Sequence, residues 1–179
     1  MFGLFRKKDS GIPVTDRVVI EEAAKWKALA DVYAANPRTI IVCWFEETLE
    51  KGMAWFTEAG ITGPEFILAR EISSRGKGGA APVFAEHYPL SSRETALFQS
   101  LQLEKAIIYS SLREPLFTRF GSDKIIGLMR QLGMKEDELI EHTMISSAIR
   151  RAQEKIEAKN GPDLGARSQE EWMRLNGIV

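Results

Sequence analysis

The sequence predicts an α/β protein: a small, mainly parallel sheet of about four strands with flanking helices, followed by C-terminal helices. Up to Leu112, apolar runs rich in β-branched residues alternate with segments in which apolar residues recur at helical spacing. The run TIIVCWF has no polar alternation, which is typical of a parallel strand covered on both faces. Beyond Leu112 only helical spacing remains.

Each predicted element follows from a start or stop signal. Apolar residues at helical spacing from Asp16 to Tyr33 predict the first helix, and Asn36-Pro37 ends it. Gly60 is placed to end the second helix and Ser92 to cap the third. The predicted order is a helix from Asp16, a strand at Thr39–Phe45, a helix at Glu46–Ala59, strands at Glu65–Glu71 and Pro82–His87, a helix at Ser92–Leu101 and a strand at Lys105–Leu112.

The C-terminal part is predicted to be helical. Two short helices are expected within Glu114–Leu132, because Gly121-Ser122 interrupts the apolar pattern. An amphipathic helix from about His142 to Lys159 follows, and Ser168–Gly177 can form a short helix anchored by Trp172. The predicted organisation is a flexible lead at 1–14, an α/β domain at 15–133, the amphipathic helix at 134–160 and a tail at 161–179.

Composition excludes several classes of partner. The chain has 179 residues, 44% of them hydrophobic, and a net charge of -1, which argues against a nucleic-acid partner. The single cysteine, Cys43, cannot form a disulfide framework, so a reducing cytoplasm is the expected location. No apolar stretch approaches the roughly 20 residues that span a bilayer, so no stable membrane insertion is expected.

The segment Glu114–Asn160 carries a dense series of short motifs. It resembles the part of the preprotein translocase motor SecA in which the second nucleotide-binding domain ends and the long scaffold helix begins. Weaker matches in the same order extend the resemblance upstream to Val14. The dense matches are Leu116-Phe117, Arg119, Phe120-Gly121-Ser122-Asp123, Gly127-Leu128-Met129, Leu132-Gly133-Met134, Ile140-Glu141-His142 and Ala152-Gln153-Glu154-Lys155-Ile156-Glu157.

The resemblance implies a degenerate RecA-like domain of the helicase C-terminal type, a relative of P-loop nucleotidases, in a bacterial protein linked to protein translocation. The motifs with which that family binds and hydrolyses ATP are missing from this chain. The chain has no G-x-x-x-x-G-K-[ST] phosphate loop, and the family's arginine-finger segment falls on Phe98–Leu101. We therefore expect no catalytic residue, no enzyme activity and no obligatory cofactor, while ATP or ADP binding stays open.

Two sets of candidate site residues remain. The glycine-rich stretch SSRGKGGAAP could bind an anion through Arg75, Gly76, Lys77 and Gly78. A proline and a strand follow it instead of a helix, so a mobile exposed connection is the favoured interpretation. Possible partner contacts are Ile145, Ile149 and Ile156, on the apolar stripe of the amphipathic helix, and Trp172, the tryptophan least expected in the core.

Neither histidine is expected to do chemistry. His87 and His142 each adjoin a glutamate, but adjacent residues on a strand point to opposite faces of a sheet. Structural roles are predicted for both, and no metal site is predicted.

These features favour a non-catalytic SecA-like interaction or regulatory module linked to protein export. Its expected partner is a protein, or a second copy of the chain bound through the C-terminal helices. The alternative is a nucleotide- or phosphate-binding domain that acts together with a separate motor subunit.

Overall fold

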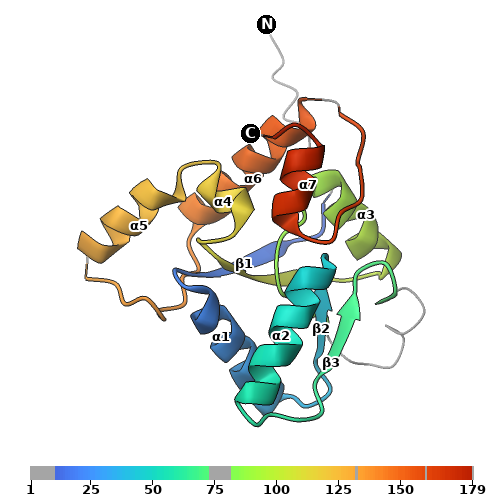
Figure 1. The fold of residues 1–179 in the computed structure, drawn as a ribbon, viewed down its shortest axis with the longest axis vertical. Coiled ribbons are helices and arrows are strands. Elements are labelled where there is room, and N and C mark those ends of the chain that lie inside the picture. The colour runs from blue at the N-terminus through green and yellow to red at the C-terminus, as the bar shows by residue number, and fades with distance from the viewer. Residues whose placement is uncertain (1–10, 73–81, 132, 160, 179) are drawn as a thin grey trace, which may run out of the picture.

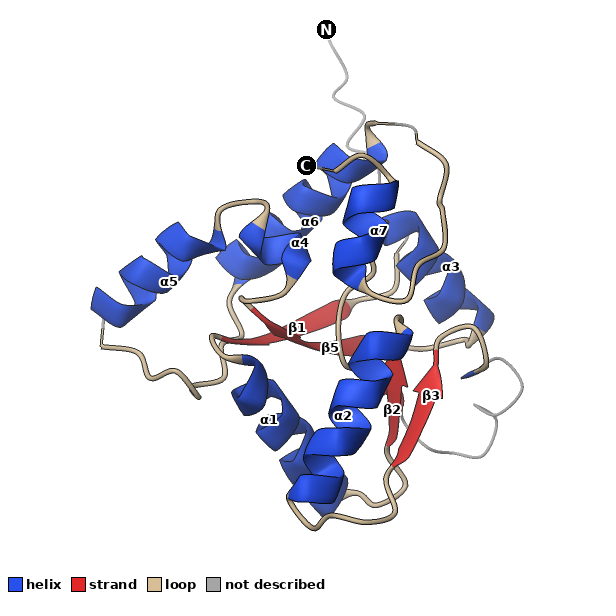
Figure 2. Cartoon of the chain, viewed as in Figure 1, coloured by secondary structure: helices blue, strands red, loops and turns tan. Residues whose placement is uncertain are grey.

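The computed structural model describes residues 11–72, 82–131, 133–159 and 161–178. Within these ranges the chain forms a five-stranded, fully parallel sheet with strand order β1-β5-β4-β2-β3, flanked by helices (Figures 1 and 2). The α/β class is confirmed, with one strand more than expected. The strands are β1 (Val14–Val19), β2 (Ile40–Cys43), β3 (Glu65–Leu68), β4 (Pro82–Phe84) and β5 (Ala106–Ser111).

The additional strand is β1, where the sequence was predicted to begin a helix. β1 pairs with β5 along its whole length, from Val14 opposite Ala106 to Val19 opposite Ser111. Helix α1 (Glu22–Ala35) begins only after this strand. The helical prediction from Asp16 is wrong because pairing with β5 decides the conformation of VTDRVV, whose valines suit a strand equally well.

The remaining helices lie close to their predicted positions. Gly121, with φ of +90°, separates α4 from α5 as expected, and His142 caps α6 by accepting a hydrogen bond from the Met144 N–H at 3.1 Å. Ser92 is not a cap, because α3 already begins at Ser91. The helices are α2 (Glu46–Glu58), α3 (Ser91–Ser100), α4 (Pro115–Thr118), α5 (Ser122–Gln131), α6 (Thr143–Glu157) and α7 (Gln169–Leu175).

Helices cover both faces of the sheet. α1 and α2 pack on one face, where Trp26, Leu29 and Phe56 meet the side chains of Ile41 and Val83. α3 lies on the opposite face together with α6 (Figure 2). Because each central strand contacts helices on both sides, its side chains are apolar in both directions, which explains the continuous apolar runs of the sequence.

The chain leaves β2 and β4 toward opposite faces of the sheet. β2 leads through α2 to β3 at one edge, whereas β4 leads through α3 to β5 in the other direction. In open α/β sheets, ligands bind in the crevice beyond the carboxyl ends of such a strand pair. The β2–β4 crevice is therefore the expected position of a functional site.

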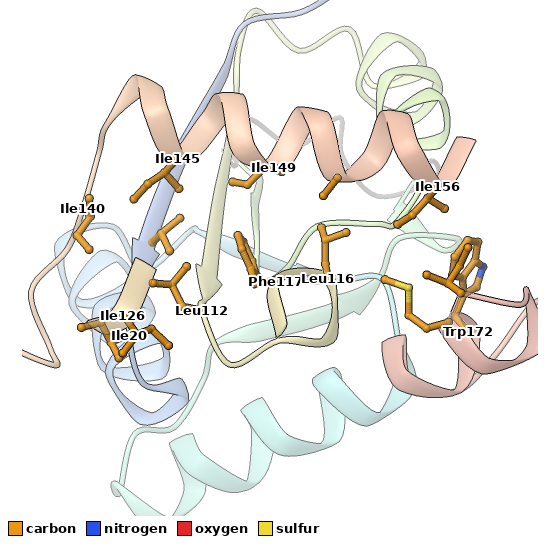
Figure 3. Packing of buried hydrophobic residues seen from close by; sticks show 14 of the residues in the cluster. Ile20, Leu112, Leu116, Phe117, Ile126, Ile140, Ile145, Ile149, Ile156 and Trp172 are labelled. Atoms are coloured by element: carbon orange, nitrogen blue, oxygen red, sulfur yellow. The ribbon is translucent and has the colours of Figure 1, made fainter. Parts of the chain in front are cut away.

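The C-terminal helices fold back onto the same core. The predicted partner contacts Ile145, Ile149, Ile156 and Trp172 are only 6%, 3%, 3% and 2% exposed. Figure 3 shows the three isoleucines of α6 directed toward Leu116 and Phe117.

An exposed apolar stripe on α6 is therefore not found, and the expectation of partner or dimer contact through these side chains loses its basis. The apolar side chains of α6 are buried because an antiparallel bridge between Val18 and Ile140 brings the chain back along β1 before α6 begins. Trp172 is a core residue after all: its ring packs against Tyr88, and its Nε1 donates to Asp163 Oδ1 at 2.8 Å. The α/β domain, the α6 segment and the tail thus share one hydrophobic cluster.

None of the helices within the described ranges is both long and apolar enough to cross a membrane.

The packing of α1 against α2 depends on Gly52. A Cβ atom at this position would lie 2.6 Å from a ring carbon of Phe66 and 2.9 Å from one of Trp26. Trp26 is 3% exposed, and Phe66 of β3 is partly buried and packs against the same cluster, so neither ring can move away cheaply. Gly127 in α5 is a matched contrast, because a Cβ atom there would meet nothing within 4 Å.

We predict that Gly52→Ala lowers the free energy of unfolding by about 1–3 kcal/mol, because overpacking outweighs the gain in helix propensity. Gly127→Ala should instead raise it by up to about 1 kcal/mol. Urea denaturation of both variants measures the difference. Equal effects of the two substitutions would contradict the close α1–α2 contact.

Candidate functional site

The crevice between β2 and β4 is spanned by a carboxylate of the protein itself. Glu86 follows β4 and is 2% exposed. Its Oε1 accepts hydrogen bonds from the backbone N–H groups of Trp44 and Phe45 at 3.0 and 3.1 Å, and the Thr48 hydroxyl donates to its Oε2 at 2.6 Å. Trp44 and Phe45 are the two residues that lead into α2, and Thr48 lies in its first turn, so the three donors lie at the entry to the helix, near the position at which α/β proteins bind phosphate groups. Glu86 therefore occupies the anion position of the crevice.

A buried ion pair lies beside Glu86. Lys25 of α1 is 2% exposed, and its Nζ contacts Glu114 Oε1 at 2.7 Å. The Ser111 N–H donates to the same oxygen at 2.9 Å, and Nζ also lies 4.5 Å from the centre of the Trp26 ring. The second oxygen of Glu114, Oε2, is buried and has no hydrogen-bond partner among the described residues.

Burial and charge act in opposite directions on this cluster. Burial raises the pKa of Glu86 to about 7; the Lys25 ammonium opposes that shift, and the neighbouring Glu114 adds to it. Burial lowers the pKa of Lys25, but attraction to Glu114 and Glu86 outweighs burial and leaves this pKa above its ordinary value. Lys25 is thus held as a cation, whereas Glu86 changes its charge near neutral pH.

The cluster forms the floor of a cleft of about 220 Å³. Five glutamates and three cations line it, together with hydroxyl and amide side chains from α2, the end of β5 and the start of α7. The charged lining residues are Glu22, Glu47, Glu86, Glu114, Glu170, Lys25, Lys51 and Arg113. The cleft thus carries more carboxylates than cations.

The tail closes one side of this cleft. Gln169, at the start of α7, donates to the His87 carbonyl at 2.9 Å and accepts from the Leu116 N–H at 2.7 Å. Arg167 pairs with Glu46 and Glu50 of α2, both at 2.8 Å. Because these contacts join the tail to the residue beyond β4, to α4 and to α2, α7 is fixed over the carboxyl edge of the sheet.

His87 points to the other side of β4 and belongs to a second buried network. Its Nδ1 lies 3.0 Å from Glu94 Oε1 and its Nε2 lies 3.1 Å from Asp16 Oδ1. Burial lowers the pKa of His87, but the two carboxylates outweigh burial and raise this pKa to about 10. Each ring nitrogen thus lies within ion-pair distance of a buried carboxylate, which is the arrangement that favours the protonated imidazole.

The sequence-predicted site residues are not brought together. Arg75, Gly76, Lys77 and Gly78 lie outside the described residues, and the four apolar candidates are in the core. The residues of the cleft were not recognised as a site from the sequence. One signal was available: Glu86 lies near the end of a predicted strand and Glu114 follows another, and both are charged residues next to apolar runs, where buried charge is unusual.

Stability should depend on the charge of Glu86. Because burial raises its pKa above the ordinary value of 4.5, ionisation costs folding free energy. That cost is absent below about pH 4.5, grows as the pH rises and is complete above about pH 7. Glu86→Gln removes the titrating group and keeps an oxygen for the α2 amides.

We predict that the free energy of unfolding of the Glu86→Gln variant, measured relative to that of the wild type, rises by roughly 1–3 kcal/mol between pH 5 and pH 8. Chemical denaturation at several pH values measures this difference. A difference that stays constant across this range would contradict the assigned environment of Glu86.

Comparison with known proteins gives matches to one part of the chain. No protein-family model matches the chain. A stretch of 52 residues, 29% of the chain, is 50% identical to protein translocase subunit SecA of Acinetobacter baylyi. It is 52% identical to the same subunit of Ehrlichia canis and of Acidithiobacillus ferrooxidans. The match spans only 6% of the length of each of these relatives. The chain therefore contains a region similar to part of SecA.

Proposed function

We propose that this chain is a non-catalytic interaction or regulatory module, related to part of SecA, which binds a protein partner in cytoplasmic protein export. The similarity to SecA supports the link to export. The observation that carries the non-catalytic part is the Glu86 carboxylate on the N-terminus of α2.

The charge of the crevice supports this proposal. A nucleotide would bring several negative charges to a cleft in which five glutamates face three cations. It would also have to displace Glu86 from three hydrogen bonds. Both requirements disfavour phosphate binding.

The position of the tail supports it further. In α/β sheets the carboxyl edge is the usual place for a ligand, and here α7 is joined to this edge by Gln169 and Arg167. Trp172 and Met173, 2% and 0% exposed, fasten α7 to the core beneath it. A partner would therefore meet a surface built jointly by the sheet edge and the tail.

The alternative is a nucleotide- or phosphate-binding domain that acts with a separate motor subunit. One observation favours it: Lys51 and Arg113 both line the cleft, where their positive charges could contact a bound phosphate. Both cations are already paired, Lys51 with Glu47 and Arg113 with Glu21, each at 2.8 Å.

We predict that Glu86→Ser creates a phosphate site that the wild type lacks. The substitution frees the amides of Trp44 and Phe45 and the hydroxyl of Thr48 beside the Lys25 cation. Millimolar inorganic phosphate should then raise the melting temperature of the variant by several degrees and leave that of the wild type unchanged. Stabilisation of the wild type by the same phosphate concentration would count against an occupied anion position.

The function itself is tested with a SecA motor from the same organism. Sedimentation velocity should show a complex between the motor and this chain, and the chain should change the motor's rate of ATP hydrolysis. Calorimetry of the chain alone with Mg-ATP and ADP should give no binding heat at millimolar nucleotide. Nucleotide binding by the chain alone would favour the alternative, and the absence of any complex would remove the proposed partner class.

A further inference from the structure

We propose that a groove along α1 binds an amphipathic helix with basic flanks, presented by the protein partner. This inference rests on the proposed function, since it names the surface and the kind of segment through which that partner would bind.

The groove consists of two adjoining hollows of about 390 and 350 Å³. They share the lining residues Ala24, Lys27 and Asp137, so they form one continuous feature, the α1 groove. One wall is α1, and the other is part of the segment between α5 and α6 (Figure 1). Tyr109 of β5 lines one hollow and Trp55 of α2 lines the other.

Apolar residues lie on both sides of α1. Trp26 and Leu29 face the core and are 3% and 0% exposed. At about 3.6 residues per turn, Ala24, Ala28 and Ala35 lie on the side of the helix away from Trp26, and all three line the α1 groove. A helix that is covered on one face normally carries polar residues on the other. The apolar outer side of α1 therefore indicates that a further element covers it.

The facing wall of the groove is apolar as well. Leu139 is 41% exposed and lines the same hollow as Val32 of α1. Exposed apolar surface with a polar rim is typical of protein–protein interaction sites. Small side chains on α1 and a larger one on the facing wall let a bound segment approach α1 closely.

The charged residues select the kind of segment that fits. Among the described residues that line the groove, four carboxylates stand against one ammonium: Glu21, Asp31, Glu136, Asp137 and Lys27. Lys27 Nζ lies 3.8 Å from Asp137 Oδ2, and Asp31 has no ion-pair partner among the described residues. Glu21 and Glu136 are paired with arginines that do not line the groove. The excess of negative charge favours lysine or arginine at the flanks of the bound segment.

The length and the walls of the groove favour a helix over an extended strand. The backbone groups of α1 are hydrogen-bonded within the helix, so this wall offers no free edge to a strand, whereas a bound helix satisfies its own backbone groups. From Ala24 to Ala35 the groove follows α1 for about 17 Å, which matches about three helical turns.

The α1 groove adjoins the surface that the sheet edge and the tail form together. Glu21 lines the groove, and the next residue, Glu22, lines the cleft at the carboxyl edge of the sheet. A partner that binds at this edge can therefore place a helix in the groove.

The test uses the full chain and three synthetic peptides of about 14 residues, which is about four helical turns. The first carries leucine and alanine on one helical face and lysine on the others. The second has glutamate in place of every lysine, which reverses the charge. The third has the composition of the first in an order without helical periodicity, which removes the apolar face.

We expect saturable binding of the first peptide in calorimetry, at least tenfold tighter than that of either other peptide. Asp31→Lys reverses a charge of the groove and Leu139→Ser removes an apolar contact, so each should weaken binding at least threefold. The same two substitutions should weaken the complex with the SecA motor at least threefold. Circular dichroism checks that both variants fold.

Two matched controls separate the groove from general effects. Glu58→Lys changes the net charge as much as Asp31→Lys does, at the end of α2 and outside the groove lining. Met53→Ser removes a 50% exposed apolar side chain two positions before Trp55, and so on another side of α2. Both controls should leave the dissociation constants unchanged.

Equal affinities for the first peptide and either other peptide would overturn the inference, as would equal dissociation constants for the wild type and the two groove variants. Self-association in sedimentation velocity that Leu139→Ser abolishes would replace the partner helix with a second copy of the chain. If the SecA complex forms and neither it nor peptide binding responds to the groove substitutions, only this inference is lost. If no SecA complex forms while the peptide shows the expected pattern, the groove remains a helix-binding site and the proposed function fails.

Discussion

The contact on which the account depends is that between the Glu86 carboxylate and the N-terminus of α2. It joins the ends of β2 and β4 across the crevice where the chain leaves the sheet in two directions. A helix N-terminus in such a crevice attracts an anion, and here the anion belongs to the protein. A fold that elsewhere carries ligands at this position is thereby closed by its own side chain.

The neighbouring charges follow from this contact. A buried carboxylate needs a nearby cation, and Lys25 supplies it from α1 while pairing directly with Glu114. Gln169 and Arg167 of the tail then bind the adjacent strand end and α2. Sheet edge, α1, α2 and tail thus form one connected polar structure.

Most of the fold was predictable from the sequence, because the relevant signals are local. The apolar run before Glu46 and the glycine stop at Gly121 gave β2 and the division between α4 and α5 near their observed positions. β1 was missed because its conformation depends on pairing with β5, about 90 residues away. Burial of the α6 stripe depends likewise on a distant contact, the bridge from Ile140 to Val18.

The candidate site was the least predictable part. No local pattern shows that Lys25, Glu86 and Glu114, which lie far apart in the sequence, meet beside one helix terminus. The glycine-rich stretch Ser73–Pro82 attracted attention because its composition resembles a phosphate loop, whereas the residues with chemical capacity are single charges that follow apolar strands. Charged residues at the carboxyl ends of predicted parallel strands are therefore the signal to examine in similar sequences.

The most direct measurement of the central claim is a nuclear magnetic resonance titration of the Trp44 and Phe45 amide groups in the wild-type protein. If Glu86 holds these amides, both signals should shift together with pH, with a midpoint near 7 as Glu86 ionises, and should not respond to millimolar phosphate or Mg-ATP. Saturable shifts of these two amides on addition of phosphate or Mg-ATP, without a pH-dependent shift of their own, would contradict it.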